Sequence, residues 1–278
     1  ILKNGLYIIS TPIGNLEDIS LRAQKTLSMV DYIICENPIH SLKLLNKLGI
    51  KKRLFSLHDY NENILIKRIE KYQHDSSIAL ISDAGSPLIS DPGHNLVNDY
   101  IKKNIFITTV PGSSSIISAL QLSGIPINNF RFFGFIPKSK ANVNTLVNEI
   151  ENLRSTSVFF VSGKRLVNFL KNILEKKIIR TITICKEITK KNERVFRGST
   201  KNIIDEILKD KNNIKGEFVV IIEGKEKKST KKVDVVIEKQ MMKLLKKFSL
   251  TDVVEIVHKL TNISKKEIYK NALQYKND

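Results

Sequence analysis

The chain of 278 residues carries 46 Lys and Arg against 28 Asp and Glu, giving a formal net charge of +18, and 41% of its residues are hydrophobic. This apolar content can build a core and excludes a disordered chain, and no run approaches the ~18 consecutive apolar residues of a membrane-spanning helix. The basic excess favours polyanionic partners such as nucleic acid, although an AT-rich genome also produces a chain rich in Lys, Ile and Asn.

The cysteine usage indicates a reducing compartment. Cys35 and Cys185, the two cysteines of the sequence, lie far apart and near no cluster of His or Cys. This spacing predicts neither a disulfide framework nor a structural zinc site, so we expect no metal and a cytoplasmic protein.

The first part of the chain alternates apolar runs with amphipathic stretches. Strands are expected at 6–10, 32–35, 53–57, 78–82 and 105–110. Helices are expected at 20–30, 41–48 and 62–73, and after each of the last two strands a Gly/Pro/Ser loop opens a further helix. The alternation predicts an α/β domain with a mainly parallel sheet, which we assign to residues 1–123.

A second alternating pattern follows a connector at 124–129. Its expected strands are 130–136, 157–161, 181–185 and 218–222, and its expected helices are 142–153, 165–174 and 201–208. We therefore predict a second α/β domain at 124–225. The remainder, 226–278, is predicted to hold a basic linker (225–232) and a helical tail with Ser249 and Ser264 as N-caps.

Three turns rich in Gly, Pro and Ser follow predicted strands of the first domain. They are Ser10–Asp18, Ser82–Gly93 and Val110–Ser115. Ligands bind at the carboxyl ends of strands in open α/β sheets, and small residues let the backbone approach them. None of the three is a G-x-G-x-x-G or Walker A loop, so neither a dinucleotide nor a nucleoside triphosphate is expected. One such loop alone would be a tight turn, but three in one domain predict a shared ligand cleft.

Several segments of the chain resemble one family. They are LYIISTPIGNLED (6–18), ISDAGSPLISDPG (81–93), VPGSSS (110–115), RFFGFIP (131–137), KGEFVVIIEG (215–224) and, in the tail, KKEIYKNA (265–272). In these segments the chain is similar to the small-subunit ribosomal RNA (cytidine-2′-O)-methyltransferases of the tetrapyrrole methylase superfamily. The stretch 82–93 is the longest and most specific of the matching motifs.

The resemblance implies two α/β domains with S-adenosylmethionine in the cleft between them, followed by a small C-terminal helical domain. It also implies methylation of a cytidine 2′-oxygen in the decoding region of 16S rRNA, on the small ribosomal subunit, by a homodimer. Carried over by motif, the cofactor-binding residues are Pro12, Gly14, Asp83, Ala84, Gly85, Ser86, Pro87, Pro111, Ser113, Ser114, Ser115, Gly216 and Glu217.

Catalytic and RNA-binding candidates rest on chemistry as well as on the resemblance. A hydroxyl is a poor nucleophile at neutral pH, so a base or a nearby cation should assist in-line methyl transfer. Glu36, at the end of a buried strand, is one candidate, and Lys186 and Glu187 are the others unless they form only an exposed ion pair. Basic residues expected to contact RNA phosphates are Lys138, Lys140, Lys164, Arg165 and Lys190. Three aromatic residues are expected in the core rather than in base stacking: Phe132, Phe133 and Phe135.

Two segments depart from the family's pattern. Glu36–His40 lacks the family's Asp and Arg and contains Pro38, and Ser162–Arg165 lacks its Glu and His but keeps Arg165. Two alternatives therefore stay open. One is a non-catalytic or relaxed homologue that binds the small ribosomal subunit, and the other is a small-molecule methyltransferase of the tetrapyrrole type, against which the net charge of +18 argues.

Overall fold

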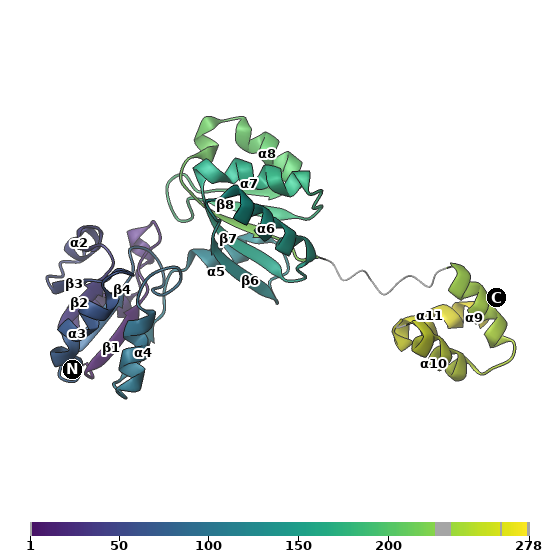
Figure 1. Cartoon of the computed structure of the whole chain (residues 1–278), viewed down its shortest axis with the longest axis horizontal. Coiled ribbons are helices and arrows are strands. Elements are labelled where there is room, and N and C mark those ends of the chain that lie inside the picture. The colour runs from purple at the N-terminus through teal and green to yellow at the C-terminus, as the bar shows by residue number, and fades with distance from the viewer. Residues whose placement is uncertain (1, 226–234, 262, 277–278) are drawn as a thin grey trace. The chain divides into compact units, whose positions relative to one another are not determined.

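The computed structural model describes residues 2–225, 235–261 and 263–276 (Figure 1). By its internal contacts the chain divides into two compact units, Ile1–Gly224 and Lys225–Asp278. The predicted basic linker, apart from Lys225, lies outside the described residues. No helix in the described part of the chain is long and apolar enough to cross a bilayer.

The first sheet is wholly parallel, as predicted, with the order β3-β2-β4-β1-β5. Its strands are β1 (Gly5–Ile9), β2 (Tyr32–Cys35), β3 (Arg53–Ser56), β4 (Ser77–Ile81) and β5 (Ile107–Val110). Helices α1 (Leu21–Met29) and α2 (Pro38–Lys47) pack on one face, and α3 (Glu62–Gln73) and α4 (His94–Lys102) pack on the other. Because the central strands are buried on both faces, they appear in the sequence as continuous apolar runs.

The second sheet is mixed, with the order β6-β7-β10-β8-β9, in which β6 and β7 are parallel and the other pairs antiparallel. Its strands are β6 (Phe130–Phe135), β7 (Thr156–Ser162), β8 (Ile182–Lys186), β9 (Arg194–Gly198) and β10 (Glu217–Ile222). Helices α6 (Lys140–Asn152), α7 (Gly163–Glu175) and α8 (Thr200–Leu208) contribute to the apolar cluster on one face. The prediction missed β9, because an edge strand with exposed basic residues lacks an apolar run.

Helix α5 (Ser115–Ser123) covers the opposite face of this second sheet, although it follows the last strand of the first (Figure 1). Its Ile116 and Leu120 share an apolar cluster with Val158, Cys185 and Val219 of the strands. The two sheets thus share one compact unit, and the division into domains at 123/124 stays a prediction.

The described part of the unit Lys225–Asp278 is helical, as predicted. It holds α9 (Val235–Leu245), α10 (Leu250–Thr261) and α11 (Lys265–Lys276) around buried Met241, Val253 and Ile268. The hydroxyls of Ser249 and Ser264 accept hydrogen bonds from the backbone N–H groups of Asp252 and Glu267, which are the N-caps expected from the sequence. The predicted fold class, two α/β sheets with a C-terminal helical part, is confirmed.

A buried carboxylate stabilises α4. The helix begins after Gly93 without a side-chain cap of its own, and Glu62 of α3, only 6% exposed, supplies the acceptors instead. Its Oε1 accepts a hydrogen bond from the backbone N–H of Leu96 at 2.8 Å, and its Oε2 accepts one from Asn95 Nδ2 at 3.2 Å. The negative charge also interacts favourably with the N-terminal end of the helix dipole.

We expect Glu62→Ala to lower the free energy of unfolding by about 2 kcal/mol, because it leaves buried N–H groups of α4 unpaired. The matched control is Glu70→Ala on the same helix, whose exposed carboxylate pairs with Lys103 of the α4 C-terminus at 3.0 Å. Its loss should cost less than about 1 kcal/mol. Urea unfolding of both variants measures the difference, and equal effects would contradict the capping role of Glu62.

Candidate functional site

The three Gly/Pro/Ser loops of the first sheet meet at one edge. Thr11 and Gly85 pair through two backbone hydrogen bonds of 2.8 and 3.0 Å. The Ser86 hydroxyl donates to the carbonyl of Ser113 at 3.3 Å and lies 3.0 Å from the Ser10 hydroxyl. These contacts join the loops that carry the cofactor-binding candidates of the first sheet. The cofactor-binding role of these residues stays a prediction.

A cavity of about 270 Å³ lies where these loops approach the second sheet. Ile13 and Ser115 line it from the first-sheet loops, and Phe160, Ile188 and Val219 form part of an apolar wall on the other side. The rest of its lining is Phe135, Val161, Ser162, Cys185, Glu187, Lys190, Glu217 and Phe218. A mostly apolar cavity with a few charged groups is typical of a small-molecule site.

The Cys185 thiol belongs to this apolar wall. Burial raises its pKa to about 11, so the thiol stays neutral at physiological pH. Both Cys185 and Cys35 are buried free cysteines.

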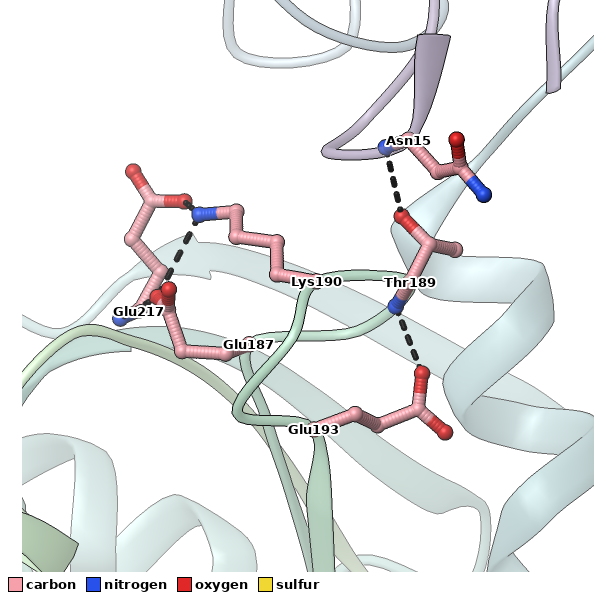
Figure 2. A network of polar contacts seen from close by, with 6 residues as sticks. All are labelled: Asn15, Glu187, Thr189, Lys190, Glu193 and Glu217. Carbon is pink, nitrogen blue, oxygen red and sulfur yellow. Dashed lines mark hydrogen bonds and ion pairs between the residues drawn. The ribbon is translucent and has the colours of Figure 1, made fainter. Parts of the chain in front are cut away.

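A polar network holds the β8–β9 loop beside the cavity (Figure 2). Lys190 Nζ lies 3.2 Å from Glu187 Oε1 and 2.8 Å from Glu217 Oε2, and Glu187 Oε1 also accepts a hydrogen bond from the Glu217 N–H at 2.8 Å. Burial alone would lower the pKa of Lys190, but its hydrogen bonds and ion pairs with Glu217 and Glu187 raise it. Two carboxylates thus compensate the charge of Lys190, which the sequence predicted as an RNA contact.

The β8–β9 loop also contacts the Ser10–Asp18 loop of the first sheet. Thr189 Oγ1 accepts a hydrogen bond from the backbone N–H of Asn15 at 3.2 Å, and the Thr189 N–H donates to Glu193 at 2.6 Å (Figure 2). Gly14 packs directly against Lys190 and Thr189, so a Cβ at position 14 would clash with both side chains. Glu187 and Thr189 adopt positive φ values of 49° and 66°, a strained conformation for residues other than glycine.

The three catalytic candidates differ in the cavities that they line. Glu187 lines the 270 Å³ cavity. Lys186 is buried, and its Nζ donates to the carbonyl of Asn212 at 2.6 Å instead of pairing with Glu187. Lys186 lines a different cavity, of about 620 Å³, and Glu187 lines this cavity as well.

Glu36 lies in a cluster of carboxylates with Asp83 and Asp91. Burial and then the negative charge of Asp83 raise the pKa of Glu36. Burial and then the charge of Glu36 raise the pKa of Asp91 to about 6. The backbone N–H of Asn37, the N-cap of α2, donates to Asp83 at 3.1 Å. Pro38 occupies the first turn of α2, so the helix begins earlier than the predicted Ser41.

Three of the five predicted RNA-binding residues lie together. Lys138, Lys140 and Arg165 line a cavity of about 360 Å³ beside α6 and α7, and Arg165 Nη1 donates to the carbonyl of Ile136 at 3.1 Å. Lys164, also exposed, is not among the residues that line it. Their contact with RNA stays a prediction.

One detail of the second sheet differs from expectation. Phe132 and Phe133 pack against apolar clusters as predicted, but Phe135 is 64% exposed and lines the 270 Å³ cavity, so its assignment to the core is wrong. In the divergent segment 162–165, a Cβ at Gly163 would clash with the backbone carbonyl of Ile214. This close approach leaves no room for a side chain at position 163.

We expect Gly216→Ala to disturb the cavity wall. Gly216 has φ +104°, and a Cβ there would lie 2.6 Å from a carboxylate oxygen of Glu187. The substitution should cost about 1–2 kcal/mol for the backbone conformation and a further loss for displacing Glu187. Gly124→Ala is the control, because Gly124 also has positive φ but open space around it. If urea unfolding shows equal losses for both variants, the contact with Glu187 does not constrain position 216.

The Asp91 carboxyl should make stability depend on pH. Its pKa rises on folding from 3.8 to about 6, so its stabilising effect is complete below pH 3.8 and is lost as the pH rises through about 6. Asp91→Asn should therefore gain stability relative to the wild type between about pH 4 and about pH 7, by ~1 kcal/mol after allowance for solvent screening. Urea unfolding across this range measures the gain. It should shrink in a Glu36→Gln background, and a pH-independent difference would contradict the interaction.

Comparisons with known proteins agree on one family. The model of the Tetrapyrrole (Corrin/Porphyrin) Methylases matches residues 5–204. A protein of Rickettsia prowazekii named "Ribosomal RNA small subunit methyltransferase I" is 42% identical, with 97% of this chain and 96% of that protein covered. A protein of the same name from Pasteurella multocida is 39% identical, with 98% of each chain covered.

Solved structures show the same fold at low sequence identity. Diphthine synthase superimposes with a TM-score of 0.60 at 15% identity, covering 78% of this chain and 89% of that chain. Uroporphyrin-III-C-methyltransferase from Thermus thermophilus superimposes with a TM-score of 0.56 at 16% identity, covering 80% and 94%. At this identity they support the fold alone. With the family model and the nearly full-length relatives, the chain belongs to the tetrapyrrole methylases and, within them, to the group named ribosomal RNA small subunit methyltransferase I.

Proposed function

We propose that the chain transfers a methyl group from S-adenosylmethionine to the 2′-oxygen of a cytidine in the decoding region of 16S rRNA. The observation that carries this proposal is the 270 Å³ cavity at which the first-sheet loops meet the second sheet, in a chain of this methyltransferase family. The net charge of +18 suits an RNA substrate. The proposed compartment is the cytoplasm.

The residues around the cavity fit this cofactor. Apolar side chains such as Phe160, Ile188 and Val219 suit a flat adenine ring, and the hydroxyls and backbone groups of the three loops suit the charged methionine end. The proposed cofactor-binding residues are those carried over by motif in the three loops and at Gly216 and Glu217. When bound, S-adenosylmethionine supplies an electrophilic methyl group on a sulfonium.

The protein's own contribution is orientation and electrostatics. Holding the ribose hydroxyl in line for displacement supplies much of the rate, because well-oriented reactions reach effective molarities of roughly 10⁵–10⁸ M. Of the three catalytic candidates, we favour Glu187, because it is the one of the three that lines the 270 Å³ cavity, whereas Lys186 donates to the carbonyl of Asn212. Lys190 and the Glu217 N–H hold this carboxylate in place.

Contacts with the rest of the RNA are proposed for Lys138, Lys140 and Arg165, whose cavity beside α6 and α7 concentrates positive charge, and for exposed Lys164. The partner is then the small ribosomal subunit. The homodimer implied by the family resemblance stays a prediction, and the mass measured by light scattering tests it.

The test is incubation of the purified chain with radiolabelled S-adenosylmethionine and small subunits from a strain that lacks this modification. We expect label on the 2′-oxygen of one decoding-region cytidine. Cofactor binding without label would favour a small-molecule substrate of the tetrapyrrole type. Absence of both would favour a non-catalytic homologue that binds the small subunit, and it would overturn the proposed cofactor site.

A bulky side chain in the 270 Å³ cavity should weaken cofactor binding without lowering the stability of the fold. Ser115→Tyr places a ring at a lining position and should weaken S-adenosylmethionine binding by roughly tenfold or more in calorimetry. Ile117→Tyr on the same helix is the control, because Ile117 is 50% exposed and does not line the cavity. Wild-type affinity in Ser115→Tyr, with its melting temperature retained, would contradict the proposed position of the cofactor.

A further inference from the structure

A largely exposed aromatic ring lines the proposed cofactor cavity. Phe135, the last residue of β6, is 64% exposed and lines the cavity. Its ring centroid lies 5.3 Å from that of Phe160, another lining residue, at an interplanar angle of 59°. Exposing a phenyl ring forfeits the hydrophobic free energy of its burial, so its position here calls for an explanation.

A β-bulge brings Phe135 to this face of the sheet. Phe132 pairs with Val158, but Phe135 pairs with Phe160, so the register shifts by one residue between them. In a regular strand Phe135 would point the same way as Phe133, which stacks on Phe159 in the core beneath α6 and α7. The shift turns it instead to the side of Phe132 and Phe160. Bulges at such places re-aim a side chain.

The bulge depends on Gly134 and directs the strand end toward a first-sheet loop. Gly134 has φ +72°, a conformation that glycine adopts without strain. A Cβ at Gly134 would lie 3.8 Å from the Ser90 hydroxyl, in the Ser82–Gly93 loop. Phe135 thus lines the cavity and directly follows a residue that lies beside one of the three loops.

We propose that Phe135 stacks on the base of the target nucleotide and so holds its ribose at the cavity. This inference rests on the proposed function. Single-stranded RNA bases stack on exposed aromatic rings, and such a stack fixes the position of the ribose to which the base is attached. The chain runs from Phe135 directly to Lys138 and Lys140, so the same segment offers cations to the flanking phosphates.

The first test is steady-state methylation of small subunits. Phe135→Ala should lower kcat/KM by about 10- to 100-fold, because a base–aromatic stack contributes about that factor. Phe135→Tyr should retain most of the activity, since it keeps a ring. Phe130→Ala is the matched control, at the other end of β6, 41% exposed and away from the cavity lining. Because Phe135 also lines the cofactor cavity, the affinity for S-adenosylmethionine should fall less in Phe135→Ala than kcat/KM does. Unchanged activity, or a loss that follows cofactor affinity, would overturn the proposal.

A second test does not require methyltransferase activity. The chain has no tryptophan, so Phe135→Trp introduces a single tryptophan, whose emission can be excited apart from that of the tyrosines. Oligocytidine RNA should quench its emission, and it should leave Phe130→Trp unquenched. Absence of quenching, or equal quenching of both variants, would overturn the stacking role. If the wild type transfers no methyl group but Phe135→Trp alone is quenched, the proposed reaction fails while the base-stacking site stands.

Discussion

The packing of α5 on the second sheet is the interaction on which the rest of the candidate site depends. The helix starts directly after the Val110–Ser115 loop, and its Ile116 and Leu120 pack on strands whose residues also line the cavity. A loop that ends at α5 is therefore held at a fixed place relative to β8 and β10. Apolar burial at about 25 cal/mol per Å² makes such a helix face a stable anchor.

The cavity wall that faces these loops contains residues in strained backbone conformations. Glu187 and Thr189 have positive φ, and a Cβ at Gly216 would displace the Glu187 carboxylate. Such conformations persist where the surroundings over-determine them. Here the ion pairs of Lys190 and the hydrogen bond from Asn15 to Thr189 provide that constraint. The polar network thus shapes the cavity and also joins the loop to the first sheet.

Much of the fold could be predicted from the sequence, and part of the site could not. Runs such as Ser77–Ile81 are apolar because both faces are buried, and the turn chemistry of Ser82–Gly93 indicated a loop at the strand end. The strained turn at Glu187 and Thr189 contains no glycine, so no local signal marked it. The position of Phe135 depends on a register shift relative to β7, and Lys186 is buried by a contact with distant Asn212. Neither the register shift nor the contact with Asn212 changes the local hydrophobic pattern, so the sequence alone could not predict them.

The position of α5 also has a consequence for synthesis on the ribosome. Its apolar face emerges before the sheet that covers it, and Val219, one of its packing partners, follows Ala119 by ~100 residues. At translation rates of about 5–20 residues per second, the face lacks part of its cover for roughly 5–20 s. During that interval all strands of the parallel sheet have been synthesised, but α5 still exposes part of its apolar face. The nascent chain is then a potential client for chaperones until β10 has been made.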